Sequence, residues 1–338
     1  MTPDFIGGID IGGTKISVGI AKPHEELIAS DSFLNNENDS ADKTILKALD
    51  ALTSLAMQAK GRLTAIGIGC PGPLDFEAGK FLAPPNLPAS WHHFPIRQFV
   101  EEKTNLRVVI ENDANAAAGG EHLFGAGRGY TDLVYLTIST GIGGGIIADN
   151  KLAHRWGEAG HITVQSDGEL CGCGARGCLE AVCSGSGIAR RTRNYLSSGR
   201  PSLMRDMADG ISQVTAKTVI EAVRADDELA KCVWDETIKF MAIGIGGMMA
   251  VLAPQAVILG GGVAIGAGDV LLKPLREELK QRVRIIEPSP VMLASLASES
   301  VLYGALALAS REYFVSSLIP PAASTDELRE DNRQSRGK

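Results

Sequence analysis

The feature that most constrains the fold of this chain is a pattern that occurs twice: a buried strand, a glycine-rich turn and a second buried strand. The first copy is FIGGIDIGGTKISVGIA, near the start of the sequence, and the second is DLVYLTISTGIGGGIIADN, in its middle. Helix and strand patterns follow each copy. The repeat therefore predicts two related α/β halves rather than a single continuous unit.

Helix and strand patterns alternate along the rest of the chain. Apolar residues at three- and four-residue intervals, such as Ile45, Leu49 and Leu52, predict helices. Short apolar runs bounded by glycine or proline predict buried strands. Outside the two repeated patterns, the predicted strands are 26–33, 63–70, 107–113, 256–259 and 291–293, and the predicted helices are 41–60, 96–103, 114–120, 228–252, 270–283 and 300–314.

The length of 338 residues suits two domains, since a domain typically has about 100–200 residues. We expect residues 1–117 to form a smaller N-terminal α/β domain, completed by a C-terminal helix over 300–318. Residues 118–299 are expected to form a larger α/β domain. Residues 320–338 are rich in charge and poor in apolar side chains, which predicts a disordered tail.

The composition argues against nucleic acid and membrane as partners. A hydrophobic content of 44% fits a globular protein, and a net charge of −7 disfavours binding to polyanions. Residues 240–268 contain no charged side chain, but Pro254 and three successive glycines interrupt them, so we predict a buried helix and strand instead of a membrane span. The first residues show no signal-peptide pattern, and we expect a cytoplasmic protein.

The glycine turns are candidates for phosphate binding. In the run Asp10–Lys15, glycines allow a tight turn that aims N–H groups at an anion, and Asp10 is placed to hold Mg²⁺ through water. An ordinary hairpin explains this run equally well on its own. Two further glycine turns, Ser139–Gly145 and Gly260–Gly262, lead us to expect a nucleotide in a cleft between domains. The spacing matches neither a P-loop nor a Rossmann motif.

Three cysteines lie close together after a histidine. His161, Cys171, Cys173 and Cys178 supply one nitrogen and three sulfurs, which suits a closed tetrahedral zinc site with no free position for water. Lasting disulfides are rare in cytosolic proteins, and the absence of a Cys-x-x-Cys pair weakens a thioredoxin-like interpretation. A redox pair or a chance cluster remains the alternative.

Asp113 ends the predicted strand 107–113 and is the candidate general base for a hydroxyl proton. Asn112 beside it can exchange hydrogen bonds with neighbouring hydroxyls. Asn and Asp also commonly cap the helix that follows them. The residues alone leave both interpretations open.

In these motifs the chain resembles the ROK family of sugar kinases and sugar-sensing repressors, and is most similar to its ATP-dependent glucokinases. The resemblance covers about Phe5 to Phe314. It implies a two-domain actin-like ATPase (hexokinase/RNase H-like) α/β fold with an interdomain cleft. The motifs that carry it are Asp10–Lys15, Glu111-Asn112-Asp113, Gly157-Glu158-Ala159-Gly160-His161 and Cys171-x-Cys173-Gly-x-x-Gly-Cys178-Leu-Glu180.

The resemblance implies a role for particular residues. It implies that Asp113 is the catalytic base and that Asp10 holds Mg²⁺. The implied zinc ligands are His161, Cys171, Cys173 and Cys178. The implied sugar-binding residues are Gly72, Asn86, Asn112, Asp113, Glu158, His161 and Glu180. The implied ATP-binding residues are Asp10, Gly12, Gly13, Thr14, Lys15, Thr140, Gly141, Gly261 and Gly262.

The activity that the resemblance implies is ATP-dependent phosphorylation of a hexose at its 6-hydroxyl, with glucose as the substrate. N-acetylmannosamine, N-acetylglucosamine or fructose is the alternative substrate. A sugar-sensing repressor of this family carries a helix-turn-helix region before the first motif, and only nine residues precede Asp10 here. The family also implies a homodimer or homotetramer.

Overall fold

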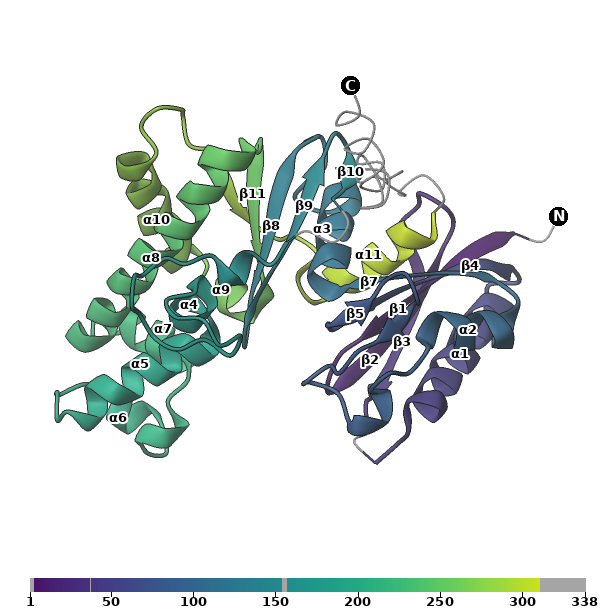
Figure 1. The fold of residues 1–338 in the computed structure, drawn as a ribbon, viewed down its shortest axis with the longest axis horizontal. Helices are drawn as coiled ribbons and strands as arrows, with labels where there is room; N and C mark the ends of the chain where they lie inside the picture. The colour runs from purple at the N-terminus through teal and green to yellow at the C-terminus, as the bar shows by residue number, and fades with distance from the viewer. Residues whose placement is uncertain (1–2, 37, 154–156, 311–338) are drawn as a thin grey trace, which may run out of the picture.

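Two five-stranded sheets organise the protein (Figure 1), and the structure, a computed structural model, describes residues 3–36, 38–153 and 157–310. The strand order is β3-β2-β1-β4-β7 in the first sheet and β10-β9-β8-β11-β12 in the second. The strands of the first sheet are β1 (Asp4–Ile11), β2 (Lys15–Ala21), β3 (Leu27–Leu34), β4 (Arg62–Cys70) and β7 (Arg107–Asn112). Those of the second are β8 (Leu133–Ile138), β9 (Ile142–Ala148), β10 (Lys151–Leu152), β11 (Ala256–Gly260) and β12 (Val291–Leu293). A short hairpin, β5 (Leu74–Asp75) and β6 (Lys80–Phe81), stands apart.

The two sheets have the same topology. In the first, β1 pairs with β2 and β2 with β3 in antiparallel fashion, whereas β4 lies parallel to both β1 and β7. In the second, β8–β9 and β9–β10 are antiparallel, and β11 lies parallel to β8 and β12. The prediction of two related α/β halves, each opening with a glycine-turn hairpin, is confirmed.

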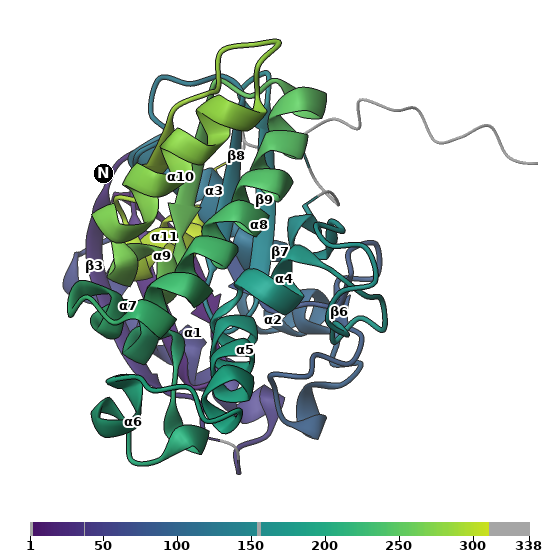
Figure 2. The same cartoon turned by 90° about the vertical axis from the view of Figure 1, so that its left-hand side faces the viewer.

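Helices cover both faces of each sheet (Figures 1 and 2). Helices α1 and α2 pack on one face of the first sheet, and α11 packs on the other. Helix α3 lies against both α11 and the second sheet, whose other face is covered by α8 and its neighbours. The helices are α1 (Ala41–Gln58), α2 (Ile96–Thr104), α3 (Asp113–Phe124), α4 (Leu179–Cys183), α5 (Gly185–Ser197), α6 (Met204–Met207), α7 (Ala216–Arg224), α8 (Glu228–Leu252), α9 (Gly261–Ala267), α10 (Asp269–Arg282) and α11 (Ser300–Ala309).

The apolar side chains of β8 show why the second sheet is covered on both sides. Successive residues of a strand point to opposite faces. Val134 and Leu136 belong to the core formed with α8, whereas Leu133 and Tyr135 pack with the alanines of α3. The sequence of a strand that is buried on both faces is a continuous apolar run, as is typical of strands in parallel sheets.

Helices α3 and α11 approach each other closely because small residues face each other between them. A Cβ atom on Gly304 would overlap the carbonyl of Ala116, and one on Gly67 of β4 would overlap the carbonyl of Ala305. Glycine at these two positions therefore brings α11 against both α3 and the first sheet. As a result, α3 lies between the two halves of the molecule, and its first residue, Asp113, faces the space between them.

A buried carboxylate fixes the other end of α3. Glu121 is 0% exposed. Its oxygens accept hydrogen bonds from the backbone N–H groups of Ala126 at 2.9 Å, Ser295 at 3.0 Å and Leu296 at 2.9 Å, and from the Ser300 hydroxyl at 2.8 Å. These donors belong to the turn after α3 and to the segment that starts α11. Glu121 thus joins segments that are more than 170 residues apart in sequence.

Most predicted elements are confirmed, and two need correction. The predicted helix 228–252 is α8, with the same bounds. The last helix spans Ser300–Ala309 and is followed by an extended backbone at Ser310, while the rest of its predicted length, 311–318, lies outside the described residues. The predicted glycine turn at 260–262 is instead the start of helix α9. Residues 311–338, including the predicted tail, lie outside the described residues, and the division of domains at 117 stays a prediction.

The segment 179–224 was not predicted, although it contains four helices, α4 to α7. In the part of the chain that the structure describes, no helix is long and apolar enough to cross a membrane.

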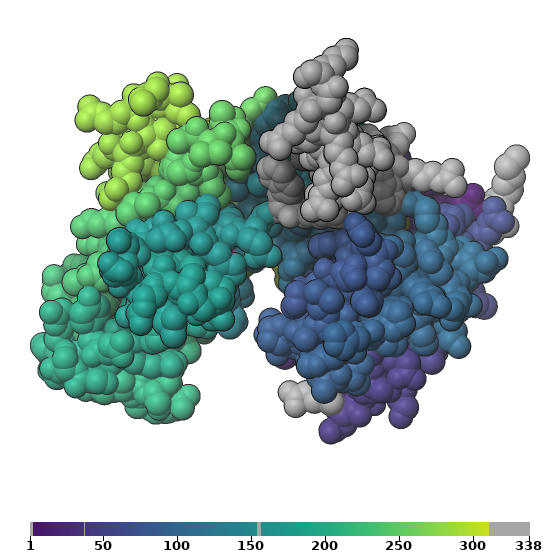
Figure 3. Space-filling model, in the orientation of Figure 1, coloured from purple at the N-terminus to yellow at the C-terminus, as the bar shows by residue number. Residues whose placement is uncertain are grey.

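The space-filling view shows a hollow between the teal residues of the second half and the blue residues of the first (Figure 3).

We predict that Glu121→Gln lowers the free energy of unfolding by about 2–4 kcal/mol, because an amide group would turn an N–H towards donors that now bond to a carboxylate. Urea unfolding followed by circular dichroism measures this change in the free energy of unfolding. Glu277→Gln, at an exposed position of α10, is the control and should change stability by less than about 0.5 kcal/mol. An equally small effect of Glu121→Gln would contradict the role assigned to this carboxylate.

Candidate active site

A cavity of about 230 Å³ lies between the two halves of the molecule. The loop after β4, the start of α3, strand β9 and the residues before the 3-10 turn at Ala159–His161 all contribute to its wall. Four of the predicted sugar-binding residues line it: Gly72, Asn112, Asp113 and Glu158. The carboxylates and the amide of this set are the donors and acceptors that a polyhydroxylated ligand needs.

The structure confirms the capping interpretation of the Asn112-Asp113 pair, and the general-base interpretation stays a prediction. Asn112 is the N-cap of α3, and its side-chain oxygen accepts a hydrogen bond from the Ala114 N–H at 2.9 Å. One oxygen of Asp113 accepts from the same N–H at 2.7 Å. Burial raises the pKa of Asp113, while hydrogen bonds to its carboxylate from the Ala114 N–H and the Asn112 side chain lower it. Asp113 also lines the 230 Å³ cavity.

Asp10 lies near Asp113 at the end of β1. The pKa of Asp10 is raised to about 7, first by burial and then by the charge of Asp113, while Lys15 opposes the rise. Two buried carboxylates that repel each other are costly unless a proton or a cation compensates their charge. This arrangement fits a cation held between them.

The first glycine turn is fixed by its own backbone and by a residue that sequence reasoning missed. The Gly12 N–H donates to the Lys15 carbonyl at 2.9 Å. The side-chain amide of Asn35 donates to the Gly12 carbonyl at 2.9 Å. Gly13 lies against the backbone of Asn86, so close that a Cβ atom on Gly13 would lie 2.8 Å from the Asn86 carbonyl. Asn86 therefore adjoins this turn, but it does not line the 230 Å³ cavity.

A second polar pair, Glu111 and Asn115, lies behind Asp113; the sequence marked Glu111 only as part of a motif and gave Asn115 no role. Glu111 is 1% exposed and accepts hydrogen bonds from the Asn112 N–H at 2.8 Å and from the Asn115 side-chain amide at 3.0 Å. Because a carboxylate only accepts, the amide nitrogen of Asn115 must face Glu111. The other end of that amide, Oδ1, has no hydrogen-bond partner in the described residues. The spacing of Glu111 and Asn115, four residues apart at a helix start, was the available signal.

The cysteine cluster forms as the sequence predicts. The ligand atoms of His161, Cys171, Cys173 and Cys178 all lie within 4.8 Å of one another. His161 Nδ1 lies 3.6 Å from Cys171 Sγ, and the Sγ atoms of Cys173 and Cys178 are 3.7 Å apart. Thiolates at about 2.3 Å from a tetrahedral zinc ion would be roughly 3.8 Å apart. The geometry of the donor set thus fits zinc.

His161 and Glu180 connect this cluster with its surroundings. The Nε2 atom of His161, on the side away from the cluster, lies 3.8 Å from a carboxylate oxygen of Glu158. One oxygen of Glu180 lies 3.7 Å from Cys171 Sγ, and the other accepts a hydrogen bond from the Ile142 N–H at 2.9 Å. Neither His161 nor Glu180 lines the 230 Å³ cavity in this structure.

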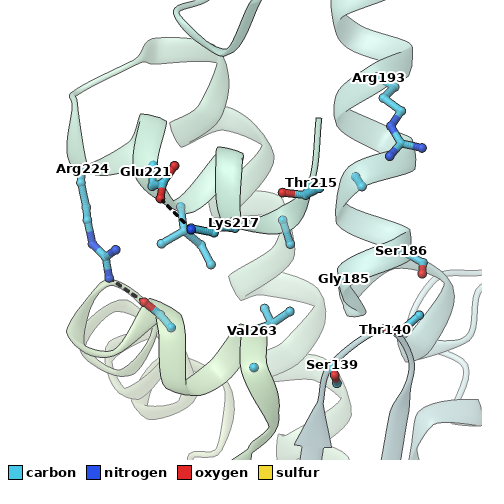
Figure 4. A pocket seen from close by; sticks show the side chains of 15 residues that line it. Ser139, Thr140, Gly185, Ser186, Arg193, Thr215, Lys217, Glu221, Arg224 and Val263 are labelled. Carbon is cyan, nitrogen blue, oxygen red and sulfur yellow. Dashed lines mark hydrogen bonds and ion pairs between the residues drawn. The ribbon is translucent and has the colours of Figure 1, made fainter. Parts of the chain in front are cut away.

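A larger cavity of about 480 Å³ lies in the second half (Figure 4). Of the predicted nucleotide-binding residues, Thr140 and Gly262 line it, whereas Gly141, Gly261 and the run Asp10–Lys15 do not. The opposite wall comes from α5 and α7, which sequence reasoning missed. The residues that these two helices and their approaches contribute are Gly185, Ser186, Ala189, Arg193, Thr215, Ala216, Lys217, Ile220, Glu221 and Arg224.

Charged side chains surround the outer part of this larger cavity. Lys217 lies 3.8 Å from Glu221, and the Arg224 guanidinium donates to the Gly266 carbonyl at 2.7 Å (Figure 4). Arg193 donates to the Val214 carbonyl at 2.8 Å. The signal for α7 was present in the sequence, since Thr215 and Thr218 form a capping box before an amphipathic run.

Residues 6–312 match the ROK family, and the chain belongs to this family. A glucokinase from Thermotoga maritima is 34% identical over 89% of this chain and 96% of that protein. The crystal structure of a ROK hexokinase from Thermus thermophilus is 33% identical, covers 91% of this chain and 98% of its own, and has a TM-score of 0.81. A ROK family glucokinase from Streptomyces griseus, solved with glucose and AMPPNP, is 33% identical over 90% of this chain and 99% of its own, with a TM-score of 0.73.

The family and the two-sheet α/β fold of the actin-like class, which were expected from the motifs, are therefore confirmed. The individual roles of the site residues stay predictions. They are supported by the convergence of Gly72, Asn112, Asp113 and Glu158 on one cavity.

We predict that Asn115→Asp makes stability depend on pH, because it places a second buried carboxylate beside Glu111. The repulsion raises the pKa of the pair in the folded protein, so the native state keeps a proton that the unfolded chain releases. Stability should therefore fall as pH rises above the ordinary carboxyl range. The loss relative to the parent protein should be about 1–3 kcal/mol larger at pH 8 than at pH 5.

Urea unfolding at both pH values measures this difference. Asn194→Asp, at an exposed position of α5, is the matched control and should show no such dependence. A pH-independent loss in Asn115→Asp would mean that Glu111 and Asn115 do not share a buried site.

Proposed function

We propose that the protein phosphorylates glucose at the 6-hydroxyl with ATP as the phosphoryl donor. The observation that carries this proposal is the cavity between the two halves, where Asp113 lies with Asn112 and Glu158. The Thermotoga maritima and Streptomyces griseus relatives named glucokinase support the substrate and the donor.

Asp113 acts as the general base in this proposal. Its carboxylate takes the proton of the sugar 6-hydroxyl as that oxygen attacks the γ-phosphorus of ATP, and the bond from that phosphorus to the bridging oxygen of ADP breaks. Asn112 is held as the helix cap and orients a neighbouring hydroxyl. The position of Asp113 between the halves allows closure around the sugar to exclude water, which otherwise competes as acceptor.

The nucleotide occupies the 480 Å³ cavity in this proposal, with its phosphates directed towards the glycine turns. Thr140 and the backbone of Gly262 are at the cavity wall, and the helices α5 and α7 face the nucleoside. The turn Gly12–Lys15 approaches the phosphates from the other half. Asp10 would hold Mg²⁺, which neutralises charge on the phosphates when bound.

The cysteine cluster is proposed to hold a structural zinc ion through His161, Cys171, Cys173 and Cys178. A closed set of four ligands leaves no position for a reactive water. When bound, the metal fixes the loop between His161 and Glu180. His161 and Glu180 would then be oriented towards the sugar, His161 with its Nε2 atom, which lies on the side of Glu158.

The alternative substrates within the family are N-acetylmannosamine, N-acetylglucosamine and fructose. A 2-acetamido group requires more room beside the sugar ring than a hydroxyl.

A repressor function, the alternative outside catalysis, is disfavoured by the presence of Asp113 in the cavity. The oligomeric state, expected as a homodimer or homotetramer, and the cytoplasmic location stay predictions.

We predict that Asp113→Asn lowers kcat about 10²–10⁴-fold, because an amide cannot accept the hydroxyl proton. The dissociation constant for glucose, measured by calorimetry, should change much less, since the variant keeps the size of the side chain. A coupled assay of glucose 6-phosphate formation gives kcat. Asp269→Asn, at an exposed position of α10, is the control. Turnover in Asp113→Asn within tenfold of the parent would contradict the base assignment.

We predict that Cys173→Ser reduces the metal content from about one zinc per chain to nearly none. The midpoint of thermal unfolding should fall as well, because the cluster no longer ties its loop together. Elemental analysis of the purified protein measures the zinc. Cys232→Ser is the matched control, since Cys232 is also exposed but lies on α8, outside the cluster. Equal zinc in both variants would refute the site.

A further inference from the structure

The turn Ser139–Ile142, between β8 and β9, separates the two regions proposed for nucleotide and sugar. On one side, Ser139 and Thr140 line the 480 Å³ cavity. On the other side, the N–H of Ile142 donates to Glu180 at 2.9 Å. The turn is therefore in direct contact with the cavity proposed for the nucleotide and with a residue proposed for the sugar.

Backbone hydrogen bonds tie this turn to its neighbours, and Ile142 at its end packs in the hydrophobic core. Ser139 and Thr140 are exposed. The Gly185 N–H donates to the Ser139 carbonyl at 2.7 Å, and the Ser186 N–H donates to the Thr140 carbonyl at 3.3 Å. The bond from Ile142 to Glu180 is the third attachment. A turn held in this way responds to a change in any one of these partners.

The position of the Glu180 carboxylate depends on the absence of a side chain at residue 141. A Cβ atom on Gly141 would lie 2.6 Å from Glu180 Oε2, which is closer than van der Waals contact allows. The backbone of Gly141 does not have a positive φ angle, so alanine at this position would not strain the backbone. Glycine at position 141 is therefore needed because it leaves room for the Glu180 carboxylate, and not because the backbone of the turn requires it.

Glu180 has acceptor capacity left after it binds Ile142. An ionised carboxylate offers about four lone-pair sites, and Oε2 uses one of them for the Ile142 N–H. Oε1 lies on the side of Cys171, at 3.7 Å from its sulfur. The same side chain can thus accept a hydroxyl of the ligand through Oε1 while Oε2 holds the turn.

We propose that Glu180 is a positioning residue that couples sugar binding to nucleotide binding through the Ser139–Ile142 turn. This inference rests on the proposed function, since it takes Glu180 as a sugar ligand and the 480 Å³ cavity as the nucleotide site. A sugar that orders the Glu180 carboxylate also orders the turn. The entropic cost of ordering the turn is then already met when the nucleotide binds, so the nucleotide binds more tightly. By linkage, the nucleotide strengthens sugar binding by the same factor.

The test is the affinity of the non-hydrolysable analogue AMPPNP, measured by calorimetry without sugar and with saturating glucose. In the parent protein we expect glucose to increase this affinity about fivefold or more, within the usual range for coupled sites. In Gly141→Ala, the added methyl group displaces the Glu180 carboxylate, and the increase should fall to less than about twofold. Gly247→Ala is the matched control, because a Cβ there meets no atom within 4 Å.

A purely structural role for the Glu180–Ile142 bond gives a different result. Gly141→Ala would then weaken AMPPNP binding equally with and without glucose, and the ratio of the two affinities would stay at the parent value. That result, or a parent protein in which glucose leaves the AMPPNP affinity unchanged, would overturn the proposal.

A second measurement needs no variant and applies even if Gly141→Ala fails to fold. Amide hydrogen exchange of the peptide that covers 139–145 should slow at least about threefold when glucose alone is added to the parent protein. Unchanged exchange in this peptide would also overturn the coupling. Failure of the proposed function looks different, because the parent protein would then form no glucose 6-phosphate from glucose and ATP.

Discussion

The close packing of α3 against α11 is the constraint on which the arrangement of the site depends. Gly304 allows the two helix backbones to approach, and the buried carboxylate of Glu121 ties the end of α3 to the segment that begins α11. This pair of helices lies between the two sheets. Because α3 is fixed there, Asp113 at its first position is presented to the cavity that both halves form.

Much of the fold and part of the site could be predicted from local patterns. The glycine-turn hairpins, the apolar helix α8 and the ligand set of the cysteine cluster depend on residues close together in sequence or on a strict chemical requirement. Asn112 and Asp113 were identified because they end a predicted buried strand. In all these cases the information lies within a short segment, which is the range in which sequence patterns are informative.

What could not be predicted depends on contacts between distant segments. The bonds of Glu121 reach Ser295 and Ser300, and no local pattern marks such a partner. Helices α5 and α7 contribute most of the wall of the larger cavity, and the capping box of Thr215 and Thr218 marks only the start of α7, not its contact with the cavity. The bond from Ile142 to Glu180 likewise joins two motifs that sequence reasoning treated separately. This bond links Glu180, at the end of the cysteine cluster, to the second glycine turn.

We propose that the residues of the cavity between the halves catalyse transfer of the γ-phosphoryl group from ATP to glucose. The most direct test is the rate of ADP release by the parent protein with Mg²⁺ and ATP, without sugar and with glucose, fructose, N-acetylglucosamine or N-acetylmannosamine. We predict that glucose gives the highest kcat/KM, with a kcat of roughly 1–100 s⁻¹, as is typical of kinases. If none of these sugars accelerates ADP release, the account of the site is wrong.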